Sequence, residues 1–415
     1  MEIVIYVREA DTIIFHFAFS ILDSSLSGVG AVLMRIVYKA ILRFLHEADI
    51  FLFALCLLCA IYGIIVISSV LGSEEYDNRL VYVQIGAMVI GIILFILFSY
   101  LDIDIIADKS GFLLFFSAMF IVTLLFWGVG EEETGNRAWL RFFNIGIQPA
   151  EVVKVTYIII IAKTTANHKE RKTINSFGSL LQILFVFLVL VGLIVVISSD
   201  LGTALVYGFI FVVMMYVGGI KLRWFALGTG VVAVMSHIVW FNYLTEGQKN
   251  RIRAPFIPDV IDPTRREVLW QTDNSVRAIT TGGFRGQGLG NGRLTQAGMI
   301  PKQHTDFIFS AVGEELGFIG CLLVVLLLVL IIIRCIHIGI KSNNPLGLLV
   351  CTGVSAMLIA QTFENLGMCL GLLPVVGITL PFFSYGGSSI VACFAAMGVV
   401  SGIKMRPKPV RFRTT

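Results

Sequence analysis

The chain has 415 residues, of which 57% are hydrophobic and only 14% are charged, and its mean hydropathy is +0.89. This composition excludes a soluble domain, whose surface would need many more polar side chains, and predicts a polytopic membrane protein. The formal net charge of +4 says little as a total, but the positions of the charges along the chain are informative.

The N-terminal stretch begins with an apolar run, TIIFHFAFSIL, that is too short to cross a bilayer. In the following segment Arg35, Lys39 and Arg43 recur every four residues, on one face of a helix, which is typical of a helix lying on an anionic membrane surface. Residues 1–49 are therefore expected to form an amphipathic, interfacial extension. No cleavable signal peptide is expected, because the start is acidic and has no compact basic region.

Ten apolar stretches follow, each long enough to cross roughly 30 Å of hydrocarbon at about 1.5 Å per residue. They lie near residues 51–71, 80–99, 112–129, 147–164, 178–199, 201–219, 223–241, 307–333, 345–372 and 383–403. The expected fold is an all-α membrane domain over residues 50–405, with about ten transmembrane helices and a long extracytoplasmic loop, residues 242–306, between spans seven and eight.

Charged residues between the spans orient this bundle, because Lys and Arg are retained on the cytoplasmic side. Basic clusters precede span one and follow spans four, six, eight and ten, which all fall on one side, and residues 406–415 form a basic tail. Both termini are therefore expected in the cytoplasm. The 242–306 loop is basic although it is external; long loops escape the rule, but a basic external loop also suits a lipid-linked phosphate.

Two polar clusters lie at predicted external ends of spans three to six. The first runs from Arg137, Trp139 and Arg141 to Glu151 and Lys154, and the last two can pair at i, i+3 on a helix face. The second surrounds Asp200, between two apolar runs. The Glu151–Lys154 pair could simply neutralise itself, and Asp200 could simply cap a helix.

A third cluster is the Gly-rich loop that begins near Gly282 and carries Arg285, Lys302, His304 and Asp306 into span eight. Backbone N–H groups of such a loop can bind phosphate, although a flexible loop is the commoner explanation. Asp306 could cap the helix, but capping explains neither Glu314 nor Glu315, which lie inside the apolar span.

The fourth cluster, the SYGGSS sequence with Ser384 and Ser388, opens span ten, where a helix N-terminus can hold an anion or pack closely on a neighbour. If the spans bundle, we expect the four clusters to converge. The sequence carries no zinc motif and no P-loop; no cofactor is indicated, and whether a divalent cation takes part is left open.

Five motifs, NRAWLRFFNIGIQPAEVVK, SSDLGTAL, GGFRGQGLGNG, IPKQHTDFIFSAVGEELGFIG and GLLPVVGITLPFFSYGGSS, closely resemble those of the SEDS family (shape, elongation, division and sporulation), which includes FtsW, RodA and SpoVE. The resemblance covers roughly residues 50–405. It implies a ten-span peptidoglycan glycosyltransferase of the bacterial cytoplasmic membrane that polymerises lipid II and extends a lipid-linked glycan, with a class B penicillin-binding protein and membrane lipids as partners and no nucleic acid.

The resemblance also assigns residues. It implies that Asp306 is the catalytic acid of the family's H-T-D-F-I-F motif. The candidate substrate-binding residues are Arg137, Trp139, Arg141, Glu151, Lys154, Asp200, Arg277, Arg285, Lys302, His304, Glu314, Glu315, Ser384 and Ser388. The alternatives are a lipid II flippase, in which the intramembrane glutamates line a polar path, and a scaffold without catalytic activity. The sequence does not decide between division, elongation and sporulation.

Overall fold

The computed structural model describes residues 42–72, 79–130, 136–142, 145–342 and 344–406. The predicted interfacial helix lies largely outside these ranges, as does most of the basic C-terminal tail. The chain divides into two compact units, Met1–Ile50 and Phe51–Thr415, and the second contains the membrane helices.

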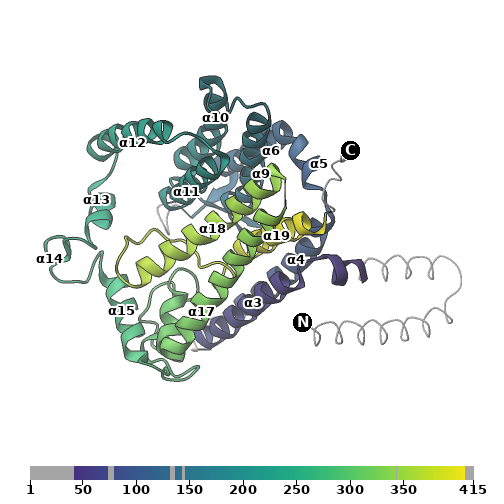
Figure 1. Ribbon diagram of the computed structural model, residues 1–415. Coiled ribbons are helices and arrows are strands. Elements are labelled where there is room, and N and C mark those ends of the chain that lie inside the picture. Colours follow the sequence, from purple (N-terminus) through teal and green to yellow (C-terminus); the bar gives the residue numbers. More distant parts are fainter. Residues whose placement is uncertain (1–41, 73–78, 131–135, 143–144, 343, 407–415) are drawn as a thin grey trace, which may run out of the picture. The chain divides into compact units, whose positions relative to one another are not determined.

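Helices dominate this unit, and Figure 1 labels most of them. The long ones are α3 (Ile50–Leu71), α4 (Arg79–Tyr100), α6 (Ser110–Val122), α9 (Pro149–Glu170), α10 (Phe177–Leu193), α11 (Leu201–Gly218), α12 (Leu222–Asn242), α17 (Ile308–Lys341), α18 (Pro345–Cys369) and α19 (Gly387–Met405). The shorter ones are α5 (Ile103–Asp108), α7 (Leu124–Trp127), α13 (Glu246–Arg253), α14 (Pro258–Ile261), α15 (Trp270–Gly282) and α16 (Arg293–Gln296), with a π-helix, η1 (Ile194–Ser198).

Nine of the ten predicted spans coincide with helical segments that, among the described residues, are long and apolar enough to cross a membrane. The tenth, span four, predicted at 147–164, is also a helix, the 22-residue α9, but its composition is less apolar than that of the other nine. Its length suffices, at about 33 Å, but it carries Glu151, Lys154 and Lys163. These charges are tolerated because α9 contacts α6, α10, α11, α18 and α19 and so lies among protein helices.

Helix α19 packs most extensively against α4, and glycines of α19 allow this. A Cβ atom at Gly398 would lie 2.6 Å from the Phe95 carbonyl oxygen, and one at Gly402 would lie 2.9 Å from that of Phe98. Small residues let two membrane helices approach to backbone contact, where dispersion forces replace the missing hydrophobic effect. This explains why the last span, although only moderately apolar, is the most enclosed of the nine.

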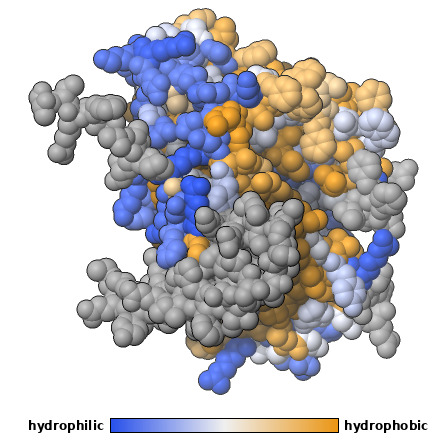
Figure 2. All heavy atoms as spheres, turned by 90° about the vertical axis from the view of Figure 1, so that its right-hand side faces the viewer, coloured by the Kyte–Doolittle hydropathy of each residue, from blue (hydrophilic) through white to orange (hydrophobic). Residues whose placement is uncertain are grey.

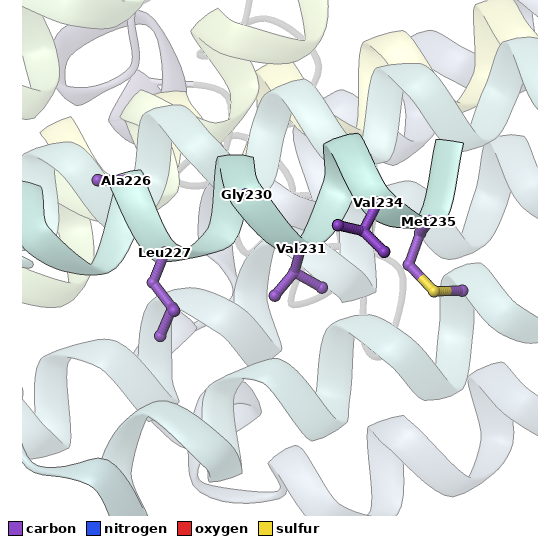
Figure 3. A pocket seen from close by; sticks show the side chains of 6 residues that line it. All are labelled: Ala226, Leu227, Gly230, Val231, Val234 and Met235. Carbon is purple, nitrogen blue, oxygen red and sulfur yellow. The ribbon is translucent and has the colours of Figure 1, made fainter. Parts of the chain in front are cut away.

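Helix α12 differs from the other long helices because none of its residues is buried. One of its faces lines an apolar groove of about 500 Å³, and Figure 3 shows Leu227, Val231, Val234 and Met235 projecting on that side. In Figure 2, hydrophobic side chains likewise cover much of the visible surface, with hydrophilic ones gathered along one side. Exposed apolar side chains of this kind suit contact with lipid hydrocarbon.

The all-α prediction needs one correction, because three short strands connect α7 to α9. Strands β1 (Gly128–Val129), β2 (Trp139–Phe142) and β3 (Ile145–Ile147) form an antiparallel sheet in the order β1-β2-β3. The segment is too short and too polar to give a clear alternating pattern in the sequence. Only the middle strand, β2, pairs with a neighbour on each side.

The 242–306 segment, predicted as a loop, contains helices α13 to α16. Its longest helix, α15, packs against α17. Helix α17 is also longer than its predicted span, 307–333, and is interrupted at Gly317, whose φ and ψ are 67° and −162°. The uninterrupted part after Gly317 has a length of about 36 Å, which by itself is enough to cross a bilayer.

Candidate active site

Asp306 lies in a series of turns that leads into α17. The N–H groups of Thr305 and Phe307 donate to the Lys302 carbonyl oxygen, and Lys302 has a positive φ of 49°. This fold places the Lys302 Nζ atom 3.8 Å from Asp306 Oδ2. The Asn365 amide of α18 donates to the Asp306 carbonyl oxygen over 2.8 Å, which fixes the backbone beneath the carboxylate.

The Asp306 carboxylate does not cap α17. The N-cap is Phe307, and the described residues provide no side-chain hydrogen bond to the first turn. The capping explanation considered from the sequence is therefore wrong for this residue. The Asp306 side chain is only 11% exposed, and because its carboxylate does not serve the helix end, it has capacity left for another partner.

The environment of Asp306 makes its carboxylate more basic. Burial raises the pKa of Asp306 above its usual range; the positive charge of Lys302 and a hydrogen bond from Thr305 oppose this rise, and the negative charge of Asp200 adds to it. A group whose pKa moves toward neutrality accepts a proton more readily than an ordinary Asp. Burial also lowers the pKa of His304, which favours the neutral imidazole.

The segment that opens α19 holds the His304–Asp306 turn from the other side. Ser384 Oγ donates to the Thr305 carbonyl oxygen over 2.6 Å, and the Tyr385 N–H donates to the His304 carbonyl oxygen over 2.8 Å. Gly377 of the same segment has a φ of 75°, and a Cβ there would lie 3.4 Å from Asp306 Oδ2. Backbone therefore passes directly beside the carboxylate.

Asp200 is the N-cap of α11. Its carboxylate accepts hydrogen bonds from the Thr203 N–H at 2.9 Å, from Thr203 Oγ1 at 2.7 Å and from the Gln148 amide at 3.1 Å. The preceding π-helix η1 and Ser199, with a φ of 56°, lead the chain into this position. The capping interpretation of Asp200 is thus confirmed, and burial still raises its pKa.

Asp200 and Asp306 lie near the same stretch of backbone. A Cβ at Gly202, two residues after Asp200, would lie 3.0 Å from the Val376 carbonyl oxygen, and the next residue, Gly377, is the one beside Asp306. The backbone at residues 376–377 therefore lies close to both Asp200 and Asp306. This placement explains why the charge of Asp200 affects the pKa of Asp306.

Glu151 and Lys154 form the predicted ion pair. Lys154 Nζ lies 2.6 Å from Glu151 Oε1, and the side chains of Lys154 and Glu151 are 1% and 9% exposed. Both charges act electrostatically on Asp200. Just before α9, the Gln148 N–H donates to the Ser388 hydroxyl oxygen over 3.2 Å. The clusters around Lys154, Asp200 and Ser388 therefore converge with the Asp306 end of the third cluster, whereas the Gly-rich part of that cluster, also predicted to converge, does not join them.

The cluster on the short sheet also lies near Asp200. The Arg137 N–H donates to the Ser198 carbonyl oxygen at the end of η1, and Arg137 Nε donates to the Gly128 carbonyl oxygen at 3.1 Å. Trp139 packs over Gly146 of β3, and Arg141 is exposed. Arg137 thus uses its guanidinium at least in part to fix the sheet.

The Gly-rich loop does not join this group. Its backbone and side chains bind Glu314 and Glu315 of α17, and Ser69 of α3 bonds both Glu315 and the Gly290 N–H. Because Ser69 lies two residues before α3 ends, Glu315 lies beside the C-terminal end of that helix. Arg277 and Arg285 are exposed.

Two site residues were missed from the sequence. Asn365 holds the Asp306 backbone, and Gln84 of α4 bridges the 384–386 turn, donating to the Ser384 carbonyl oxygen and accepting from the Gly386 N–H. The sequence signal that could have identified both residues is that each is a polar side chain inside an apolar span. Among the described residues, no group of His, Cys, Asp or Glu is placed to hold a metal ion.

Comparisons with known proteins match this architecture. The family model for the FtsW, RodA and SpoVE proteins, described as "Cell cycle protein", matches residues 49–408. The chain is 33% identical over 371 residues to a probable peptidoglycan glycosyltransferase FtsW of Bacillus subtilis, covering 85% of this chain and 89% of that protein. It is 30% identical over 372 residues to the protein of the same name from Trichlorobacter lovleyi, covering 88% and 96%.

A solved structure, "Structural coordination of polymerization and crosslinking by a peptidoglycan synthase complex", shares the fold. One of its chains superposes with a TM-score of 0.70 and is 29% identical in sequence. The match covers 86% of this chain and 98% of the other.

Proposed function

This chain belongs to the FtsW, RodA and SpoVE family of cell cycle proteins, and on that premise we propose that it polymerises lipid II into glycan strands at the outer face of the bacterial cytoplasmic membrane. It is a multi-pass membrane protein and a peptidoglycan glycosyltransferase. The observation that supports the assignment of a site is the buried, basic Asp306 carboxylate beside Lys302, at the start of a membrane helix.

The proposed reaction needs a base for the acceptor hydroxyl and a cation for the leaving diphosphate. The Asp306 carboxylate takes the hydroxyl proton while the oxygen forms a bond to the anomeric carbon of the donor sugar. The bond from that carbon to the lipid diphosphate breaks, and the diphosphate leaves with the electron pair. Lys302 is 47% exposed at its side chain, so it can turn toward this developing charge.

The other candidate residues have supporting roles. Gln148, Asp200 and Ser388 form a hydrogen-bonded chain between α9, α11 and α19, which holds three helix ends around the reacting groups. The exposed Arg277 and Arg285 are available to phosphate at the membrane surface. Lys154 is fully buried against Glu151, so it stabilises the site and does not reach a substrate.

Orientation and partner follow from the same assignment. The basic connections between spans favour cytoplasmic termini and an extracytoplasmic 242–306 segment, with Asp306 on the side where lipid II would be polymerised. The similar solved complex couples polymerisation with crosslinking. A class B penicillin-binding protein, which carries out crosslinking, is therefore the partner we propose.

The test is polymerisation of labelled lipid II by the purified full chain in lipid nanodiscs. Asp306→Asn keeps the volume of the side chain but removes the proton acceptor, so the rate should fall roughly 10²–10⁴-fold. Asp259→Asn is the matched control, because Asp259 lies in the same external segment with its side chain 85% exposed. Near-normal polymer from folded Asp306→Asn protein would refute the assignment, and lipid II transport without polymer from the parent would favour a flippase.

A further inference from the structure

Helix α17 is interrupted at a position that only glycine can occupy. Gly317 has a φ of 67°, and a Cβ there would lie 2.3 Å from the Gly286 nitrogen. An interruption of this kind leaves carbonyl groups before it and N–H groups after it without their usual partners four residues away. In a low-dielectric setting these groups must be bonded by another part of the chain.

The Gly-rich loop supplies those partners. Before the break, the carbonyl oxygens of Glu314 and Glu315 accept from the N–H groups of Gln287 and Gly288, both at 2.9 Å. After the break, the Phe318 N–H donates to the Gly283 carbonyl oxygen at 2.9 Å, and the Ile319 N–H donates to the Phe284 carbonyl oxygen at 3.3 Å. The backbone on both sides of Arg285 is therefore fixed to α17.

The Glu314 side chain fixes the second half of the loop. One carboxylate oxygen accepts from the Leu294 N–H at 2.8 Å, and the other accepts from the Thr295 N–H at 2.8 Å and from Thr295 Oγ1 at 2.6 Å. The side chain is fully buried. Arg293, which immediately precedes these donors, is held as well, because its N–H donates to the Gln287 side-chain oxygen at 3.1 Å.

Glu315 connects the same loop to α3. Its carboxylate accepts from Ser69 Oγ at 2.5 Å and from the Gln296 amide at 2.9 Å. Ser69 in turn accepts from the Gly290 N–H at 2.7 Å. The loop is thus bonded at both ends and in the middle, while the side chains of Arg285 and Arg293 stay exposed.

We propose that Glu314 is a positioning residue: it does not bind substrate, but its side chain holds residues 293–296 of the loop so that Arg293 faces the phosphates of the lipid-linked substrate. This rests on the proposed function. A carboxylate with both oxygens occupied by loop donors and no exposed surface has no room for a ligand. The break lies nine residues into α17, about 14 Å along the helix from its start, so the loop acts on substrate binding and not on proton transfer.

Glu314→Gln tests this proposal, because a Gln of the same shape accepts with only one of its two terminal atoms. Whichever way the amide turns, one of the Leu294 and Thr295 N–H groups faces an NH₂ group. Losing a hydrogen bond to a charged group should speed hydrogen exchange at that amide by at least about 10-fold. The KM for lipid II should rise by a similar factor with kcat unchanged, as expected when binding common to ground and transition states is lost.

Double substitutions separate positioning from simple stabilisation. Arg293→Ala should raise KM in the parent chain but add little in the Glu314→Gln background, because Arg293 immediately precedes the two donors that the Glu314 carboxylate holds. Glu246→Gln, an exposed carboxylate of the same segment, is the control and should change neither exchange at residues 294–295 nor KM. If Glu314→Gln fails to fold, Thr295→Val removes one donor and should give a smaller change in the same direction.

Two results would overturn the proposal. Faster loop exchange with an unchanged KM would show that the order of the loop does not serve the substrate. A fall in kcat at constant KM would make Glu314 part of the chemistry. If the parent chain makes no polymer at all, the proposed function fails, whereas the exchange measurement still decides whether Glu314 holds the loop.

Discussion

Removing either partner of the Glu151–Lys154 pair should destabilise the chain more than removing both. Each side chain is enclosed in the bundle, and the two charged atoms are 2.6 Å apart. Loss of one partner leaves a buried, uncompensated charge, which costs about 3–5 kcal/mol. Replacing both by neutral side chains of similar volume, Gln and Met, leaves no such charge and should cost far less.

Asp200 makes the two single substitutions unequal. Its carboxylate is within electrostatic range of both partners. Glu151→Gln leaves the Lys154 ammonium with a nearby anion, whereas Lys154→Met leaves two carboxylates facing each other without a cation. Lys154→Met should therefore be the more damaging change, toward the upper end of a range of about 3–5 kcal/mol.

The assay is the thermal midpoint of the parent, both single variants and the double variant, purified in the same nanodiscs and heated at one scan rate. The matched control is the pair Glu246–Lys249, which has the same i, i+3 spacing and a 2.8 Å separation but a glutamate 73% exposed. Its removal should leave the midpoint almost unchanged, because solvent screens exposed pairs. A double variant no more stable than Lys154→Met would refute the reasoning.

Three further outcomes are expected. Burial raises the pKa of Asp306, so the folded chain binds this proton more tightly than the unfolded chain does. Stability is therefore lost as pH rises from about 3.9, the unfolded pKa, and the loss is complete above the folded pKa. Asp306→Asn should melt at a higher temperature than the parent at pH 7, and equal midpoints at that pH would contradict this reasoning. Gly317→Ala should abolish folded yield, since its Cβ would meet Gly286, while Gly228→Ala, with no described atom within 4 Å of the new Cβ, should express normally. A reporter fused near Gly290 should respond as extracytoplasmic, and a cytoplasmic signal would place the site on the wrong leaflet.

The sequence alone determined the membrane spans, because each transmembrane helix satisfies its own backbone and needs only a sufficiently long apolar run. Nine predicted spans match described helices of that kind. Span four shows the limit of this argument: α9 is a helix with a buried ion pair, and its polar residues are acceptable only because other helices surround it. The short sheet at 128–147 was missed because two to four residues per strand leave no readable period.

Motifs in the sequence also marked the site without giving its geometry. Asp306, Asp200 and Glu151 were identified as separate clusters, and the pairing of Glu151 with Lys154 followed from their spacing on one helix. The capping of α11 by Asp200 could also be predicted from the neighbouring sequence, because an Asp before an apolar run is a common helix start. Contacts within four residues are the ones that local sequence can specify.

Only the tertiary structure decided which distant residues meet. Gln84 bonds a turn 300 residues later, Asn365 holds the backbone of Asp306, and Ser69 holds Glu315. The sequence placed Glu314 and Glu315 with the substrate groups because two charges in an apolar span suggest a functional site. The broken helix gives these two glutamates a different explanation. The interruption at Gly317 brings the Gly-rich loop against α17, and the two carboxylates accept hydrogen bonds from that loop. Such an arrangement arises only when segments far apart in the chain pack together.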